Sequence, residues 1–252
     1  MVKISIVTVC FNSEATIRDT IESVLAQTYS DIEYIVVDGA SHDNTLDIVR
    51  EYESRIAVII SEPDKGIYDA MNKGVMAATG DYVGILNSDD VFADVNVVKD
   101  LADFLADNPG LDGVYADLVY VQKNSLDKVT RYYSSKEFSP WKIRFGFMCP
   151  HPTFYVKPET FRKFGFYKLG YRVAADFELM ARFFKRGANL KRFSRVMVKM
   201  REGGISSTGI WWRIHQNMEI VRACKENGIY TNLSLISLKL PFKLLSYVRK
   251  AA

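Results

Sequence analysis

Two hydrophobic periodicities alternate along the first 90 residues of the chain. Apolar, β-branched runs have the length and composition of buried strands at residues 4–9, 32–37, 57–60 and 82–86. Between these runs, apolar positions recur at helical spacing around residues 17–25, 46–52 and 68–76. Repeated strand-helix units predict an α/β domain with a mixed, mostly parallel sheet flanked by helices, whose ligands bind beyond the carboxyl ends of the strands.

Polar residues before the first two helices have the chemistry of helix caps. Asn12 and Ser13 precede the first helical pattern, and residues 41–44 (SHDN) precede the second. Side-chain oxygens of these types accept hydrogen bonds from the free N–H groups of a first helical turn. The sequence therefore predicts that both helices begin close after these residues.

The pattern changes in the middle of the chain. Residues 113–121 and 129–133 alternate polar and apolar positions on either side of residues 123–125 (KNS), which is typical of a hairpin. An irregular stretch then follows around Cys149 and His151. A helix over about residues 176–186, a strand near residues 195–200 and a helical, basic remainder complete the prediction.

Composition is that of a globular protein. The chain has 252 residues, of which 48% are hydrophobic and 13% aromatic, enough to bury a large core. The three cysteines, Cys10, Cys149 and Cys224, are far apart and form no Cys-x-x-Cys pair. This usage fits a reducing compartment and argues against a thiolate zinc site. The N-terminus lacks the features of a signal peptide, so a cytoplasmic protein is expected.

Charge is distributed unevenly along the chain. From residue 185 onward there are 14 Lys and Arg residues against 3 acidic ones, whereas the preceding part has 19 basic and 27 acidic residues. Such an asymmetry points to an anionic partner for the C-terminal part.

Acidic residues follow two of the predicted strands. Asn87, Ser88, Asp89 and Asp90 come directly after the fourth strand, and Asp38 ends the second. Either group could form only a turn or a cap. Adjacent carboxylates at such an edge also suit Mg²⁺ or Mn²⁺, which bind carboxylate and phosphate oxygens. The chain has no Gly-rich phosphate loop, so a cation is expected to neutralise a bound diphosphate.

Four ordered motifs resemble those of the family 2 glycosyltransferases. They stand at residues 5–12 (SIVTVCFN), 36–45 (VVDGASHDNT), 62–74 (EPDKGIYDAMNKG) and 80–90 (GDYVGILNSDD). The third is similar to the branch that builds bacterial surface polysaccharides of the colanic-acid type. The resemblance, which extends over about residues 3–205, implies a GT-A fold, inverting chemistry and a nucleotide-diphosphate sugar such as a UDP- or GDP-sugar.

The resemblance also implies which residues bind the donor. Thr8, Phe11 and Asp38 would surround the base and ribose, and Asp89 would bind Mn²⁺ or Mg²⁺ with Asp90 close by. The family often has Asp where this chain has Asn87, which puts the metal affinity or the donor sugar in question. The full expected donor set is Thr8, Val9, Phe11, Asn12, Asp38, Gly66, Asp69, Asn72, Lys73, Asn87, Ser88, Asp89 and His151.

Asp176 is the expected catalytic base. Residues 174–179 (AADFEL) open the predicted helix and are similar to the family's base segment, although Ala175 stands where an acidic residue often precedes the base. A carboxylate at this place could take the proton of the attacking hydroxyl, a role worth roughly 10²–10⁴-fold in rate. The alternative is a carboxylate at a helix N-terminus that the helix dipole stabilises and keeps ionised.

Other motifs carry weaker predictions. His151, between two prolines, could contact the acceptor or the donor phosphate, or could simply pack in a loop. Residues 203–206 (GGIS) resemble a segment that closes over the donor phosphates in the family, and are otherwise an ordinary turn. Lys65 is interpreted as a solvated surface lysine.

Two features bear on the type of reaction. The chain lacks both the Gln-x-x-Arg-Trp motif of the family's processive synthases and their membrane spans, which favours addition of a single sugar to an acceptor such as a lipid-linked oligosaccharide. A nucleotide-sugar-binding protein without catalysis is the main alternative. A nucleotidyltransferase would be expected to have a Gly-rich, basic loop near the N-terminus, which residues 9–12 do not provide.

The C-terminal region, residues 208–252, is expected to be a basic amphipathic extension of a transferase domain at residues 1–207. Residues 232–252 mix leucines with lysines and arginines, too charged to span a bilayer but suited to an anionic membrane surface. Packing against the domain or in a homo-oligomer is the alternative. Nucleic acid is not expected as a partner, since few aromatic residues are interleaved with the charges. The predicted location is the cytoplasmic face of the inner membrane.

Overall fold

The computed structural model describes residues 1–203 and 210–239. The strands are β1 (Ile4–Cys10), β2 (Ile32–Asp38), β3 (Val58–Ser61), β4 (Tyr82–Ile85), β5 (Val91–Phe92), β6 (Gly113–Gln122), β7 (Ser125–Tyr133), β8 (Tyr155–Val156) and β9 (Leu190–Arg201). The α-helices are α1 (Ile17–Leu25), α2 (Thr45–Arg50), α3 (Ile67–Ala77), α4 (Val97–Ala106), α5 (Pro158–Phe164), α6 (Ala175–Lys185), α7 (Ile210–Glu226) and α8 (Leu233–Ser237). Short 3₁₀ turns occupy Glu53–Arg55, Pro140–Phe145 and His151–Thr153.

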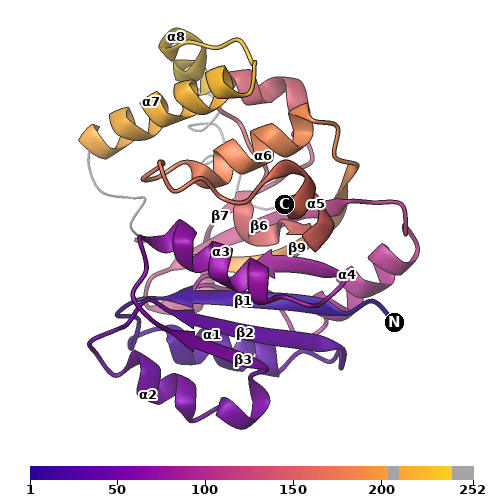
Figure 1. The fold of residues 1–252 in the computed structure, drawn as a ribbon, viewed down its shortest axis with the longest axis vertical. Helices are drawn as coiled ribbons and strands as arrows, with labels where there is room; N and C mark the ends of the chain where they lie inside the picture. The colour runs from indigo at the N-terminus through magenta and orange to yellow at the C-terminus, as the bar shows by residue number, and fades with distance from the viewer. Residues whose placement is uncertain (204–209, 240–252) are drawn as a thin grey trace.

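One twisted sheet forms the centre of the molecule (Figure 1). Its order is β3-β2-β1-β4-β8-β6-β9-β5, with β7 paired to β6. β3, β2, β1 and β4 run parallel, as the strand-helix repeats predict, and β6 also runs parallel to β9. The antiparallel pairs involve β5, β7 and β8. The predicted mixed, mostly parallel sheet flanked by helices is confirmed.

Alternating residues of the central strands face two separate cores. In β1, Ile4 and Ile6 belong to the core on the side of α1 and α4, whereas Val7 and Val9 belong to the core beneath α3 and α6. Successive side chains of a strand point to opposite faces, so a strand covered on both sides must be apolar throughout. This is why the runs in the sequence are continuous rather than alternating.

Several elements were not predicted. The buried residues of α4 stand at helical spacing. The periodicity that indicates this helix is therefore present in the sequence, although the helix is not among the predicted elements. β5 and β8 have two residues each, too few for any periodicity to be detected. β9 begins at Leu190, five residues before the predicted strand, because its first half pairs with β6 despite its polar sequence.

The predicted caps of the first helix are wrong. α1 begins at Ile17 after Thr16, and no side chain caps it. Asn12 instead adopts a left-handed backbone conformation, and its side chain accepts a hydrogen bond from the N–H of His42. The polar residues after β1 hold neighbouring loops together rather than a helix terminus.

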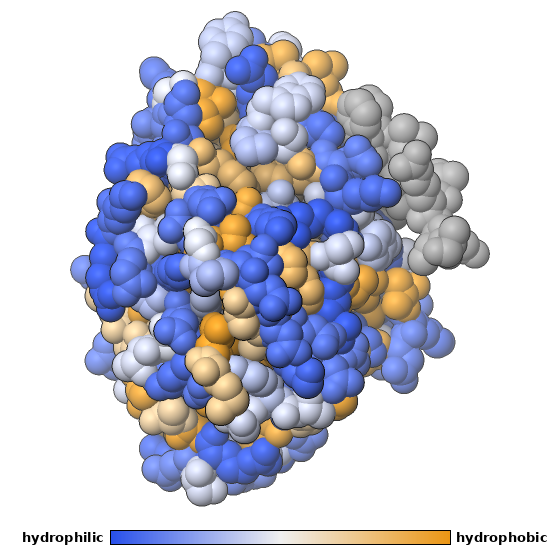
Figure 2. All heavy atoms as spheres, turned by 90° about the vertical axis from the view of Figure 1, so that its right-hand side faces the viewer, coloured by the Kyte–Doolittle hydropathy of each residue, from blue (hydrophilic) through white to orange (hydrophobic). Residues whose placement is uncertain are grey.

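The described part of the C-terminal region packs on the domain. Ile220, Ala223 and Cys224 of α7 and Ile236 of α8 are buried in the same core as α6. Up to Lys239, the packing alternative for this region therefore holds, and the rest of the tail lies outside the described residues. No helix among the described residues is both long and apolar enough to cross a bilayer. On the face shown in Figure 2, apolar side chains form small groups among hydrophilic ones.

Candidate active site

The loops that follow β1, β2 and β4 meet at one edge of the sheet. The N–H of Asn12 donates to Ser41 Oγ at 2.9 Å, and the hydroxyls of Ser13 and Ser88 lie 2.9 Å apart. The three strands are parallel neighbours, so their carboxyl ends must come together. The structure thus gathers most of the predicted donor residues at this edge.

Phe11 is the exposed aromatic side chain of the edge. Its ring is 56% exposed and contacts His42 edge-on, with ring centroids 6.3 Å apart. An exposed ring held by a second ring offers a flat apolar surface on which a nucleotide base can stack. Phe11 therefore has the geometry expected of a base-binding residue.

Asp38, Thr8 and Val9 are buried instead. The Asp38 carboxylate accepts hydrogen bonds from Ser41 N–H at 3.2 Å and from Ser61 Oγ at 2.7 Å. The Thr8 hydroxyl is bonded to the Tyr34 hydroxyl at 3.1 Å, inside the core. In this arrangement Asp38 holds the loop after β2, and the side chains of Thr8 and Val9 do not face the edge.

Asp64, a residue of the motif at positions 62–74, lies over the same edge. A Cβ atom on Gly39 would lie 2.4 Å from Asp64 Oδ2 and 3.5 Å from the Phe11 ring, so both side chains approach this glycine. Asp64 is partly exposed, and its other oxygen accepts the N–H of Gly66 at 2.7 Å. A carboxylate beside an exposed ring can accept hydrogen bonds from a base or a ribose.

The start of α3 supports this edge. Gly66 precedes the helix with a φ of +110°, a conformation that favours glycine. Asp69 accepts the N–H of Lys65 at 3.0 Å, and Lys73 Nζ lies 2.9 Å from both the Pro63 carbonyl and Glu62. These side chains order the residues around Asp64.

Asn72 faces the opposite way. Its amide donates to the carbonyl of Tyr167 and accepts from the N–H of the same residue, both at 2.9 Å. Both polar ends of a buried amide are thereby satisfied. Asn72 ties α3 to the segment before α6, and the structure does not bring it to the donor edge.

Residues 87–90 contain the unsatisfied oxygens of the edge. Asp89 is partly exposed, whereas Asp90 is fully buried. Asp90 accepts a hydrogen bond from Asn87 Nδ2 at 3.2 Å. Among the described residues, Asn87 Oδ1 and Asp90 Oδ1 are buried without any hydrogen-bond donor. Burial raises the pKa of Asp89, and burial together with Asp89 raises the pKa of Asp90 well above its usual range.

These features fit a divalent cation, which would satisfy the unpaired oxygens and keep the carboxylates ionised. Asp89 and Asn87 are partly exposed, whereas Asp90 is fully buried. Within residues 1–203 and 210–239, no three His, Cys, Asp or Glu side chains converge in a metal cluster. Phosphate oxygens and water would have to complete the coordination.

Asp176 occupies the second position of α6 and is partly buried. Its carboxylate accepts the N–H of Phe177 at 2.7 Å and has no ion-pair partner among the described residues. Burial raises the pKa of Asp176 to about 6, although the hydrogen bond from Phe177 lowers it. The negative charge of Glu219 raises the pKa further. Burial outweighs the dipole, and the group is still mostly ionised at pH 7, as a carboxylate at a helix N-terminus is expected to be.

Glu178, two residues later, is the contrasting acid. It is fully buried and paired with Arg182 at 2.8 Å and Lys168 at 2.9 Å. Burial alone would raise the pKa of Glu178, but the hydrogen bonds from these two cations hold it below its usual range. Glu178 is fixed in a structural ion pair, which leaves Asp176 as the acid of this helix that can exchange a proton.

Comparisons with known proteins agree with this geometry. The model of the family described as "Glycosyl transferase family 2" matches residues 5–173. The chain belongs to this family. A Mycobacterium tuberculosis protein named "PGL/p-HBAD biosynthesis glycosyltransferase" is 30% identical over 209 residues, covering 81% of this chain and 79% of its own length. The chain is thus a glycosyltransferase of family 2.

Two solved structures share the fold. Staphylococcus aureus TarS (residues 1–349) in complex with UDP-GlcNAc has a TM-score of 0.71 at 18% identity and covers 94% of this chain and 71% of its own. The mannosyltransferase PcManGT from Pyrobaculum calidifontis, in complex with GDP-Man and Mn²⁺, has a TM-score of 0.69 at 17% identity and covers 98% and 73%. The glycosyltransferase has the predicted GT-A fold.

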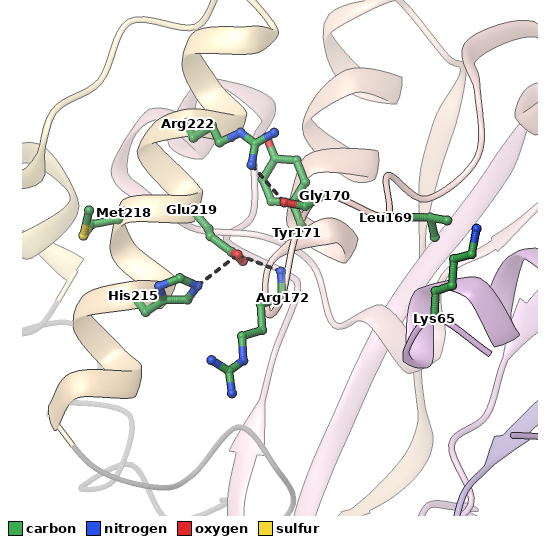
Figure 3. A pocket seen from close by; sticks show the side chains of 9 residues that line it. All are labelled: Lys65, Leu169, Gly170, Tyr171, Arg172, His215, Met218, Glu219 and Arg222. Carbon is green, nitrogen blue, oxygen red and sulfur yellow. Dashed lines mark hydrogen bonds and ion pairs between the residues drawn. The ribbon is translucent and has the colours of Figure 1, made fainter. Parts of the chain in front are cut away.

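The matched part ends at Val173, and the residues beyond it complete the site. Glu219 of α7, 7% exposed, accepts the N–H groups of Arg172, Val173 and Ala174 at 2.7, 2.8 and 2.9 Å (Figure 3). His215 Nε2 lies 3.2 Å from the same carboxylate. Glu219 thereby fixes the loop that leads into Asp176. No local sequence pattern indicates this role, since the partners are more than 40 residues apart.

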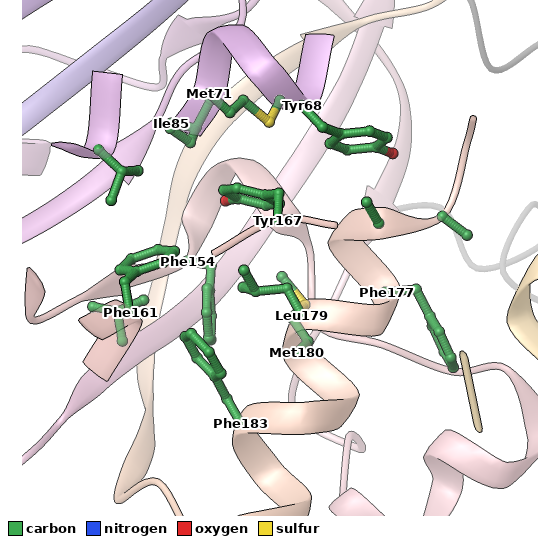
Figure 4. Close-up of a cluster of buried hydrophobic side chains, with 14 of the residues drawn as sticks. Tyr68, Met71, Ile85, Phe154, Phe161, Tyr167, Phe177, Leu179, Met180 and Phe183 are labelled. Carbon is green, nitrogen blue, oxygen red and sulfur yellow. The ribbon is translucent and has the colours of Figure 1, made fainter. Parts of the chain in front are cut away.

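Tyr68 of α3 holds the other side of that loop. Its hydroxyl donates to the Val173 carbonyl at 2.7 Å, and its ring stacks on Tyr167 with centroids 6.0 Å apart (Figure 4). The Tyr167 hydroxyl lies 2.8 Å from His151 Nε2. Burial lowers the pKa of His151 to about 4, so the ring is neutral at pH 7. His151 lies behind Tyr167 in the wall and is not brought to the donor edge.

A cavity of about 660 Å³ opens beside this loop, between α7 and the start of α3. Its lining includes Lys65, Leu169, Arg172, His215, Met218 and Arg222 (Figure 3). Glu219 also lines it, so the loop before Asp176 forms part of its wall. Of the residues 203–206 that resemble a phosphate-closing segment, all but Gly203 lie outside the described residues.

Proposed function

We propose that this glycosyltransferase transfers a single sugar from a nucleotide-diphosphate sugar to an acceptor hydroxyl, with inversion at the anomeric carbon and Asp176 as the base. The observation that carries the proposal is a partly buried carboxylate that has no ion pair among the described residues and follows a loop that lines a cavity, in a chain of this family. Its raised pKa, about 6, lets it stay ionised at neutral pH and still accept a proton readily.

The inverting course is supported by the state of the neighbouring acids. A retaining enzyme that uses a covalent intermediate needs a second carboxylate as its nucleophile. Glu219 is held by three backbone N–H groups and Glu178 by two cations, so neither is available. Asp176 would accept the proton of the acceptor hydroxyl while its oxygen bonds to the anomeric carbon and the nucleoside diphosphate departs.

The donor would bind at the edge formed by β1, β2 and β4. Phe11 would stack on the base, and Asp64 would accept hydrogen bonds from the base or ribose. Asp89 would bind Mn²⁺ or Mg²⁺, with Asn87 and Asp90 close by. The ion would neutralise charge on the diphosphate. The fold neighbours named with UDP-GlcNAc and with GDP-Man and Mn²⁺ support a nucleotide sugar and a cation.

The acceptor is proposed to be a lipid-linked saccharide or glycolipid of the cell surface. The mycobacterial relative is named for PGL/p-HBAD biosynthesis, which favours glycolipid or polysaccharide synthesis. Those basic residues of the C-terminal region, 208–252, that face the solvent would bring the enzyme to the anionic cytoplasmic face of the membrane, each contributing roughly 1 kcal/mol near that surface.

The test is release of nucleoside diphosphate from a panel of UDP- and GDP-sugars with membrane lipid extract, with Mn²⁺, Mg²⁺ or EDTA. We expect cation-dependent turnover of one donor, and its loss in Asp176→Asn without loss of donor binding. Turnover that Asp176→Asn leaves intact would remove the residue from its proposed role. A donor that binds without turnover under any condition would instead indicate a nucleotide-sugar-binding protein.

A further inference from the structure

Two cations of the cavity beside the Asp176 loop have no charged partner among residues 1–203 and 210–239. Lys65 and Arg172 are exposed, and neither side chain forms an ion pair within the described part of the chain. Arg172 packs over the ring of Trp212, with its guanidinium carbon 5.6 Å from the ring centroid. By contrast, Arg222 is paired with Glu226 at 2.7 Å, and His215 lies against Glu219.

The charge balance of the lining is positive. Lys65, Arg172 and Arg222 face one acid, Glu219, which is already bonded to backbone N–H groups. An exposed guanidinium fixed over an aromatic ring keeps its forked donors free for an oxyanion. A phosphate is the anion that this geometry suits best.

The same cavity has an apolar side. Leu169 is 46% exposed and Met218 is 57% exposed, and both line it. Solvent-exposed apolar side chains beside free cations suit a ligand that carries a phosphate next to a hydrocarbon chain.

We propose that this cavity binds the acceptor through a phosphate attached to an apolar chain, with Arg172 and Lys65 as the phosphate ligands. The inference rests on the proposed function, since it treats the cavity as the acceptor side of the transferase. None of its lining residues belongs to residues 87–90, where the donor diphosphate would bind.

The position relative to the base supports this assignment. Arg172 belongs to the loop that Glu219 holds, and Asp176 follows four residues later. A smaller adjoining cavity of about 130 Å³ shares Lys65, Leu169 and Arg172 and is also lined by Tyr68, whose hydroxyl is bonded to that loop. A phosphate at Arg172 therefore leaves the adjoining sugar next to the loop that carries the base.

The experiment measures binding of geranyl diphosphate by titration calorimetry, with geraniol, UDP and GDP as comparison ligands. The proteins are the wild type, Arg172→Gln, Lys65→Gln and, as a matched control, Lys163→Gln, an exposed lysine of α5 that does not line the cavity. We expect wild type to bind geranyl diphosphate more tightly than geraniol. Arg172→Gln and Lys65→Gln should each weaken that binding roughly tenfold or more, because each removes a charge-assisted contact. Lys163→Gln should not.

Any of four results would overturn the inference. Geranyl diphosphate could fail to bind, geraniol could bind equally well, or Lys163→Gln could weaken binding as much as Arg172→Gln does. If Arg172→Gln weakened UDP and GDP binding to the same extent, the cations would serve the donor diphosphate, and the acceptor assignment would be wrong. Arginine-dependent binding without turnover of any donor sugar would support the site and refute the proposed reaction, so the two failures are distinguishable.

Discussion

The acidic side chains differ between two regions of the molecule. One is the loop edge that follows β1, β2 and β4, and the other is the helical wall formed by α3, α6 and α7. At the loop edge, the oxygens of Asp38 accept hydrogen bonds from Ser41 and Ser61. One buried oxygen of Asp90 has no hydrogen-bond donor among the described residues. In the helical wall, Glu178 and Glu219 are fully engaged, while Asp176 has no cation beside it. In each region the bonded acids hold the structure, and another acid has the proposed functional role: Asp89 at the cation site and Asp176 as the base.

The difference between the regions lies in what the free acid lacks. Among the described residues, Asn87 Oδ1 and Asp90 Oδ1 lack a hydrogen-bond donor, and a cation nearby would meet that need. Asp176 lacks a charge that would suppress its pKa, which leaves it able to accept a proton. The comparison predicts that loss of the cation ligand at residues 87–90 weakens donor binding. Loss of the Asp176 carboxylate should remove turnover.

The largest expected effect is that of Asp176→Asn. We expect kcat to fall by roughly 10²–10⁴-fold, with the donor dissociation constant unchanged, as measured by diphosphate release and by calorimetry. Glu178→Gln is the matched control. It breaks a buried ion pair and should lower the melting temperature, with residual activity in the protein that stays folded.

Asp176 also gives a pH signature. Because its pKa is raised to about 6, the wild-type kcat should fall as pH drops through about 6. Ionisation of a group with a raised folded-state pKa opposes folding, so its contribution to stability is present at low pH and lost as pH rises through about 6. Asp176→Asn should therefore melt higher than wild type at pH 8 and similarly at pH 4. A lower melting temperature at pH 8 would contradict this account.

The next effect is expected at the loop edge. Asp89→Asn should lower the affinity for Mn²⁺, measured in the presence of UDP or GDP, by at least roughly tenfold. The rate at saturating donor and cation should change much less than in Asp176→Asn. Asp81→Asn, which alters an exposed acid before β4, serves as the control. Equal activity of Asp89→Asn and wild type at limiting Mn²⁺ would remove Asp89 from the cation site.

Glu219→Gln tests whether α7 positions the base. The amide oxygen can replace only one of the two carboxylate oxygens that accept from the loop. The side chain also carries no charge, so the apparent pKa of Asp176 in the kcat profile should shift downward. We expect kcat to fall about tenfold, as a misplaced general base allows. Glu226→Gln on the same helix should leave the pH profile in place. An unshifted profile in Glu219→Gln would mean that Glu219 acts on stability alone.

The smallest effect on kcat is expected from Phe11→Ala. Loss of an exposed stacking surface should weaken donor binding by about 1–3 kcal/mol, with kcat nearly unchanged. Phe11→Tyr should restore binding, because it keeps the ring. Wild-type affinity in Phe11→Ala would place the base elsewhere on the edge.

The sequence alone determined the elements whose signals are local. Continuous apolar runs predicted strands covered on both faces, and their repetition with helical patterns predicted the parallel half of the sheet. Because parallel strands end at one edge, the positions of Phe11, Asp38 and residues 87–90 followed at once. The four motifs within this region were enough to predict the family, and the comparisons confirm that prediction.

Only the tertiary structure decided which of the named side chains are free. Thr8, Asn72 and His151 are engaged by Tyr34 and Tyr167, whereas Asp64 and Glu219 proved to face the site. These pairings join residues from about 16 to 95 positions apart. Periodicity describes only neighbours along the chain, so it predicts which elements form. Whether a polar atom is satisfied, and hence its pKa and its use, depends on contacts between elements, which only the folded chain defines.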